Sequence, residues 1–139
     1  MSYISDISRA DRMAASEDFP RVILLDNTSA CNLRCSMCDH HNIKQYRKIQ
    51  TMPYELYCKI IDEVAVESPE SRIWEIFFGD PFLCRDMPKR IAYAQKKGLK
   101  DVVVNTNRQL MTRDRSKEYK ESGLAAIYVV IGAAKTENN

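Results

Sequence analysis

Three cysteines within eight residues constrain this chain more than any other feature of its sequence. Cys31, Cys35 and Cys38 stand in the run Cys-Asn-Leu-Arg-Cys-Ser-Met-Cys. If this run folds as a loop, its spacing lets three thiolates converge on one centre, and soft thiolates select iron–sulfur clusters, zinc or Cu(I). Three ligands hold three corners of a cubane cluster and leave the fourth iron open and reactive.

Composition favours a metal over disulfides. The chain has 139 residues, five cysteines and a net charge of +2. Three of the cysteines are too close together for an ordinary disulfide framework, so we expect a metal site in a reducing cytoplasm. The near balance of charge gives no case for nucleic acid or an anionic membrane. No secretory signal and no apolar run of eighteen residues is visible, so no membrane span is expected.

Four apolar strands are predicted to alternate with helices. The strands are expected at Arg21–Leu25, Arg72–Phe78, Asp101–Val104 and Ala126–Ile131, and the helices at Pro53–Val66, from Met87 to before Gly98, and at Thr112–Ser122. Continuous apolar strands in this alternation are typical of an α/β fold of parallel β/α units with both sheet faces covered. Residues 1–20 are polar and are interpreted as an N-terminal tail.

Polar turns directly follow the predicted strands. They are the cysteine loop, Gly79-Asp80-Pro81, Asn105-Thr106-Asn107 and Gly132. In parallel β/α folds, chemistry gathers at the carboxyl ends of the strands. We therefore expect these turns to surround one site.

The cysteine run resembles the signature of the radical S-adenosylmethionine (radical SAM) enzymes, Cys-x-x-x-Cys-x-x-Cys after the first strand. The resemblance implies that Cys31, Cys35 and Cys38 bind a 4Fe–4S cluster and that SAM chelates the fourth iron. Reductive cleavage of SAM would give a 5′-deoxyadenosyl radical that abstracts a substrate hydrogen. It also implies a peptide or small-molecule substrate and an external one-electron donor such as flavodoxin or ferredoxin.

A second stretch supports the resemblance. Phe78-Gly79-Asp80-Pro81 is similar to the family's Gly-Gly-Glu-Pro-like motif, which holds the SAM ammonium, with Phe in place of the first Gly and Asp in place of Glu. By this resemblance Gly79, Asp80 and Pro81 are predicted to bind the cofactor. Glycine lets a backbone approach a ligand closely, and a carboxylate pairs with an ammonium.

Further positions match less fully. Met37 occupies the position whose backbone meets the adenine in the family. Asn105 and Asn107 resemble the family's Thr-Asn-Gly ending of the third strand, with Arg108 in place of Gly, and are predicted to line the cofactor or substrate. Val130 and Gly132 stand where the family has polar and acidic residues, which predicts weak SAM binding.

The resemblance covers the chain from Arg21 onward and is closest to the branch with a SPASM extension. It implies that residues 21–139 are the N-terminal portion of a radical SAM core, an incomplete TIM-like barrel of about four β/α units without the later strands. Such a portion is either a fragment or is completed by another chain.

Two other functions remain open from the residues alone. One is a module that carries an iron–sulfur cluster without SAM chemistry, which the identities of Val130 and Gly132 favour. The other is a tetrahedral zinc site formed by the three cysteines with His40 or His41.

Overall fold

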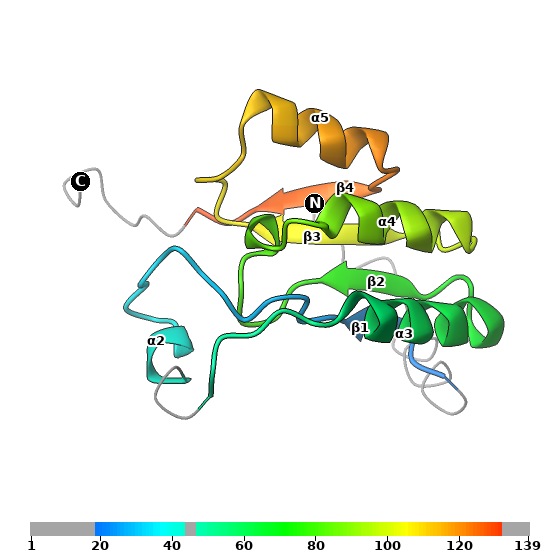
Figure 1. The fold of residues 1–139 in the computed structure, drawn as a ribbon, viewed down its shortest axis with the longest axis horizontal. Helices are drawn as coiled ribbons and strands as arrows, with labels where there is room; N and C mark the ends of the chain where they lie inside the picture. The colour runs from blue at the N-terminus through cyan, green and yellow to red at the C-terminus, as the bar shows by residue number, and fades with distance from the viewer. Residues whose placement is uncertain (1–18, 44–46, 132–139) are drawn as a thin grey trace, which may run out of the picture.

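A parallel sheet of four strands, with helices in the connections, forms the fold (Figure 1). The computed structural model describes residues 19–43 and 47–131. Its elements are β1 (Val22–Leu24), α2 (His40–Ile43), α3 (Tyr54–Glu67), β2 (Arg72–Glu75), η1 (Pro81–Leu83, a 3₁₀ turn), α4 (Met87–Lys96), β3 (Val102–Thr106), α5 (Arg113–Glu121) and β4 (Ala126–Val129).

The strands follow one another in the sheet in the order of the chain, β1-β2-β3-β4, and every neighbouring pair is parallel. Ile23 lies opposite Ile73, which lies opposite Val102, and Val104 lies opposite Ile127. The predicted α/β fold of about four parallel β/α units is thereby confirmed. The carboxyl ends of all four parallel strands lie on one side of the sheet, which we call its carboxyl edge. The loop that carries α2 extends from this edge (Figure 1).

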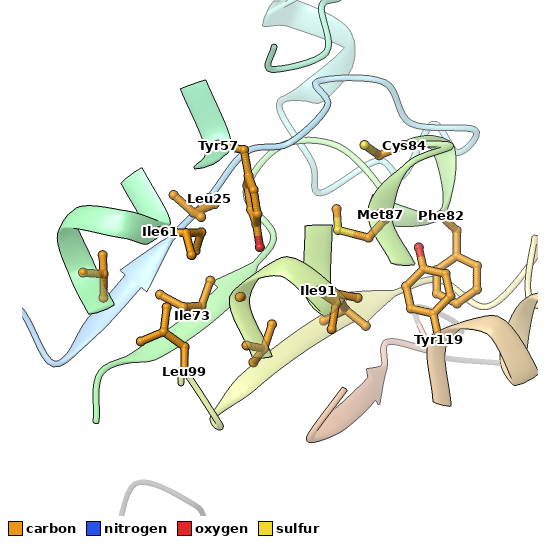
Figure 2. Packing of buried hydrophobic residues seen from close by; sticks show 14 residues of the cluster. Leu25, Tyr57, Ile61, Ile73, Phe82, Cys84, Met87, Ile91, Leu99 and Tyr119 are labelled. Atoms are coloured by element: carbon orange, nitrogen blue, oxygen red, sulfur yellow. The ribbon is translucent and has the colours of Figure 1, made fainter. Parts of the chain in front are cut away.

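The apolar stripes of the helices form the core with one layer of strand residues. On α3 the buried residues Tyr57, Ile61 and Val64 recur at helical spacing, as an amphipathic helix requires. Figure 2 shows Tyr57 and Ile61 beside Ile73 of β2. Helix α4 contacts both α3 and α5 and packs on β3.

The N-terminal cap of α5 and an aromatic stack fix that helix despite its polar sequence. Thr112 accepts a hydrogen bond from the Arg115 N–H through its side chain, which satisfies one of the unpaired donors of the first turn. Tyr119, the only strong apolar residue expected there, is fully buried and stacks on Phe82 with ring centroids 4.2 Å apart (Figure 2). The predicted third helix is confirmed.

Burial of β1 on both faces was expected and is wrong. Val22 and Leu24 are 43% and 51% exposed, whereas Leu25 is buried. β1 lies at the edge of the sheet and pairs only with β2. In the described part of the chain its second face has no covering layer, so the apolar run reflects one buried face only.

The second strand is shorter than its apolar run predicts. It ends at Glu75, because the Ile76 N–H turns back to donate to the Trp74 carbonyl at 2.9 Å. Phe77 is then 58% exposed. The fourth strand likewise ends at Val129 rather than Ile131, and the third continues through Thr106.

The end of the predicted tail touches the folded part. Ser71 Oγ donates to the Pro20 carbonyl at 2.8 Å, and Phe19 packs on the core. The rest of the predicted tail, residues 1–18, lies outside the described residues. Among the helices that the structure describes, none has the length and apolar character needed to cross a membrane.

Candidate functional site

The cysteine loop is closed at its base by two paired stems, which we call the neck. The neck consists of residues 27–29 and 50–52. The Met52 N–H donates to the Asn27 carbonyl and the Ser29 N–H to the Gln50 carbonyl, both at 2.9 Å. These bonds return the chain to the sheet edge after the loop, so the cysteines are carried on a closed loop next to the end of β1.

The three cysteines lie on the exposed part of this loop. Cys35 and Cys38 are exposed and Cys31 is half-buried. The Cys38 N–H donates to the Cys35 carbonyl at 3.1 Å, so these two residues are the ends of one tight turn. Cys31 Sγ accepts a long contact from the Leu33 N–H at 3.5 Å. The structure therefore places three soft donors on one loop at the sheet edge.

This donor set fits an iron–sulfur cluster, although the thiols are not gathered. Within residues 19–43 and 47–131, no three His, Cys, Asp or Glu side chains are arranged to hold a metal ion. Metal binding draws ligands together and displaces their protons, so an exposed loop can gather its thiolates as a cluster binds. The thiolates would converge by movement of the loop above the neck.

His40 is buried and hydrogen-bonded within the chain, so it is not placed to act as a metal ligand. It is 5% exposed, and its Nε2 lies 2.7 Å from the Ser29 carbonyl. A carbonyl only accepts, so Nε2 carries the hydrogen, and Nδ1 is buried with no hydrogen-bond partner among the described residues. His40 thus fastens α2 to the neck. The side chain of His41, the other candidate zinc ligand, lies outside the described residues.

Gly79 lies directly against the stem that leads to Cys31. A Cβ at this position would lie 1.8 Å from the Thr28 carbonyl oxygen and 2.7 Å from that of Ala30. The next residue, Asp80, donates its N–H to the Ala30 carbonyl at 2.8 Å. The close approach that glycine permits here is to the backbone of the cysteine loop itself.

Asp80 is buried and fully engaged within the chain. It is 4% exposed, and its carboxylate accepts from the Phe82 and Asn107 N–H groups at 2.9 Å and from Thr106 Oγ1 at 3.0 Å. The first bond caps η1, which begins at Pro81. Asp80 therefore joins the turn after β2 to the end of β3. That Gly79, Asp80 and Pro81 bind SAM stays a prediction.

We expect Asp80→Asn to destabilise the fold. The nitrogen of the new amide cannot accept a hydrogen bond, so it opposes one of the two N–H groups, of Phe82 or Asn107, that the carboxylate now satisfies. A buried donor without a partner costs about 1–3 kcal/mol. Urea unfolding measures the loss. Thr112→Ala, which removes the exposed cap of α5, is the control, at about 1 kcal/mol. An equal or smaller loss in Asp80→Asn would contradict this account.

The turn after β3 holds the residue that follows Cys31. Asn107 donates to Asn32 Oδ1 at 2.8 Å, and Asn32 donates to Gln109 Oε1 at 3.1 Å. Arg108, which stands where the family has Gly, adopts a φ of 68°, a conformation that glycine favours. Asn107 is thus beside the cysteine loop, and its predicted cofactor contact stays untested.

The other predicted site residues lie apart from these contacts. Asn105 accepts from Trp74 Nε1 at 2.7 Å, and Trp74 also contacts the ring of Tyr128. Met37 is 80% exposed within the Cys35–Cys38 turn, and Val130 is 55% exposed. Gly132 lies outside the described residues.

The sequence analysis did not predict a buried polar network that lies below the neck. Glu75 is 1% exposed and accepts from Tyr57 at 2.7 Å and from the side-chain amide of Asn27. Arg90, also 1% exposed, donates to the other end of that amide at 3.2 Å. Burial raises the pKa of Glu75 to about 7. The signals were a carboxylate within an apolar strand and an arginine on the apolar face of a helix.

The chain matches known proteins along most of its length. Residues 28–136 match the Radical SAM superfamily. The chain is 30% identical over 124 residues to the Fe-coproporphyrin III synthase of Methanosarcina barkeri, covering 89% of this chain and 30% of that protein. It is 31% identical over 126 residues to the GTP 3′,8-cyclase of Aquifex aeolicus, covering 86% and 37%.

The fold also matches a solved structure. It superposes on the crystal structure of BtrN in complex with AdoMet and 2-DOIA with a TM-score of 0.73 and 21% identity, covering 84% of this chain and 48% of BtrN. The chain thus spans about a third of the length of the curated relatives it matches. SPASM-type proteins are among the relatives, as the resemblance implied. With the cysteine loop at the carboxyl edge of a parallel sheet, the match over residues 28–136 shows that the chain belongs to the radical SAM superfamily.

Proposed function

We propose that this chain is the part of a radical SAM enzyme that binds the cluster and SAM. The observation that carries the proposal is the placement of three cysteines on one exposed loop whose neck is closed at the carboxyl edge of the sheet. Members of the superfamily bind a 4Fe–4S cluster and SAM and need an electron donor and a substrate. Because the chain spans about a third of its relatives, the activity of the whole protein is part of the proposal.

In this proposal Cys31, Cys35 and Cys38 hold the cluster. When bound, cluster and SAM supply reductive cleavage to a 5′-deoxyadenosyl radical that abstracts a substrate hydrogen. The chain holds the loop in place through the neck and through the turn at Gly79. The hydrogen bond from Asn107 to Asn32 holds the residue after Cys31 at the same edge.

The remaining components follow from the chemistry. We propose a peptide or small-molecule substrate and an external one-electron donor such as flavodoxin or ferredoxin. Thiolate ligands require reducing conditions, which supports a cytoplasmic location. β4 is an edge of the described sheet, and its unpaired side is where further strands, from this or another chain, would continue the barrel.

We expect anaerobic reconstitution to give about four irons and four sulfides per chain. Replacing Cys31, Cys35 or Cys38 by alanine removes one of three protein ligands, so each variant should lose the visible charge-transfer absorption. Cys58→Ala and Cys84→Ala are matched controls, since Cys58 lies on α3 and Cys84 is buried beside Asp86. Both controls should keep the absorption.

The same samples distinguish the other functions. Stoichiometric zinc without iron uptake would contradict the proposal and support the zinc site. If SAM leaves the electron paramagnetic resonance spectrum of the reduced cluster unchanged, the chain is a cluster carrier without SAM chemistry. A SAM-dependent change of that spectrum, lost in the three alanine variants, supports the proposed function.

A further inference from the structure

One guanidinium group contacts both stems of the neck. Arg90 projects from α4, and its side chain is 2% exposed. Its Nη1 donates to the side-chain oxygen of Asn27 at 3.2 Å, and its Nη2 donates to the carbonyl oxygen of Met52 at 2.7 Å. Asn27 begins the stem that leads into the cysteine loop, and Met52 ends the stem that leaves it. The two stems are therefore held by one planar group as well as by each other.

The guanidinium is itself fixed in direction. Asp86, one turn earlier, accepts from Arg90 Nε at 3.1 Å and pairs with Nη2 at 3.0 Å. The Arg90 group also lies over the ring of Tyr57, 5.2 Å from its centroid. A buried arginine with a bidentate carboxylate has little rotational freedom, because moving it would leave a charge unpaired in the interior. Two of its three remaining N–H donors bond the neck.

The amide of Asn27 is oriented by opposite groups on its two sides. Arg90 can only donate, so it faces the amide oxygen, and the carboxylate of Glu75 accepts from the amide nitrogen. Glu75 in turn accepts from the Tyr57 hydroxyl at 2.7 Å. The first residue of the neck is thus held between α4 on one side and β2 with α3 on the other.

We propose that Arg90 is a positioning residue for the cysteine loop. Its planar guanidinium group sets the spacing and direction of the two stems. Through the stems it sets how Cys31, Cys35 and Cys38 are oriented toward a cluster. The inference rests on the proposed function. Arg90 acts on the loop through its hydrogen bonds to Asn27 and Met52.

A lysine cannot replace this group. Its ammonium carries the same charge but is one point on a flexible stem, whereas arginine offers five donors in a fixed plane. Lysine at this position can pair with Asp86 or reach one stem, and it cannot hold both stems and the carboxylate together. Arg90→Lys therefore removes the geometry and keeps the charge.

The chain contains a closely matched control. Arg72, 7% exposed, makes a bidentate pair with Asp101, donating from Nε at 2.8 Å and from Nη2 at 3.0 Å. The partner carboxylates of Arg72 and Arg90 have the same exposure, 37%. Arg72 begins β2, so it lies at the amino ends of the parallel strands, whereas the cysteine loop lies at their carboxyl ends. Arg72→Lys thus makes the same chemical change away from the neck.

The experiment compares the two lysine variants in two states of the protein. Without metal, hydrogen exchange of the Ser29 and Met52 amides, which form the neck bonds, reports on the stems. We expect exchange to be at least tenfold faster in Arg90→Lys and unchanged in Arg72→Lys at matched stability. After anaerobic reconstitution, we expect Arg90→Lys to hold less than half the iron of the unmodified chain, with altered g-values of the reduced cluster. Arg72→Lys should match the unmodified chain.

Several outcomes would decide the matter. Equal exchange and equal cluster spectra in the two lysine variants would overturn the inference. If Arg90→Lys does not fold, Asn27→Ala removes the same contact from the other side, and it must show the same faster exchange at Met52 for the inference to stand. If the unmodified chain takes up no cluster, the proposed function fails, while the exchange comparison still tests the hold of Arg90 on the neck.

Discussion

Replacing Gly79 by alanine is expected to be among the most damaging single substitutions in this chain. The added methyl would lie 1.8 Å from the Thr28 carbonyl oxygen and 2.7 Å from that of Ala30. Both obstacles are backbone atoms, so no side chain can turn aside to make room. Overpacking typically costs about 1–3 kcal/mol, and here the displaced stem also carries the neck bonds, so we expect about 3 kcal/mol or more.

Gly98→Ala is the matched control for this substitution. Gly98 has a φ of 99°, and a Cβ there would meet nothing within 4 Å, so alanine is strained but not blocked. We expect it to cost about 1–2 kcal/mol, the ordinary penalty of a left-handed conformation. Urea unfolding at constant pH gives both values. A larger loss for Gly98→Ala than for Gly79→Ala would show that the stem moves aside readily.

The stability of the fold is expected to fall as the pH rises from about 4.5 to about 7. Burial raises the pKa of Glu75 from 4.5 to about 7, so in this range the folded chain keeps a proton that the unfolded chain has released. The unfolded state binds fewer protons, and each pH unit then removes up to about 1.4 kcal/mol, about 3 kcal/mol in all. Above pH 7 this contribution is constant.

Glu75→Gln isolates the effect. The amide is isosteric and does not titrate, so the free energy of unfolding should lose most of its slope between pH 5 and pH 7. Asp62 and Asp86 have pKa values lowered by their hydrogen bonds to Lys97 and Arg90, so they act in a separate, more acidic range. Denaturant unfolding at half-unit pH steps measures both chains. An unchanged slope in Glu75→Gln would assign the dependence to other groups.

Much of the fold could be predicted from local pattern. The helical spacing of Ile61 and Val64 on α3, the proline at the start of α4 and the glycine after it are local signals, and each marks an element found in the structure. The errors came from apolar runs. Ile76–Phe78 and Val130–Ile131 were predicted to continue their strands and do not. Hydrophobicity alone does not show where a strand ends.

The site was predictable in its position and not in its contacts. The three cysteines and the turn at Gly79 were found because each is a short run of characteristic residues. The bonds of Asp80 to Thr106 and of Asn27 to Glu75 and Arg90 join residues 26 to 63 positions apart in sequence, and no local pattern predicts them. A buried charge within an apolar run predicts that a partner exists without showing which residue it is.

Because the neck is closed, the length of the cysteine loop can change with little effect on the sheet. Ser29 and Gln50 are bonded to each other, so the residues between them add no strain to β1 or α3 when their number changes. Doubling such a loop costs only about 0.6 kcal/mol in closure entropy, a small part of the stability of a domain. Insertions beyond the third cysteine, ahead of Gln50, are therefore thermodynamically cheap, and proteins that share this base can vary widely in the chain that surrounds the thiolates.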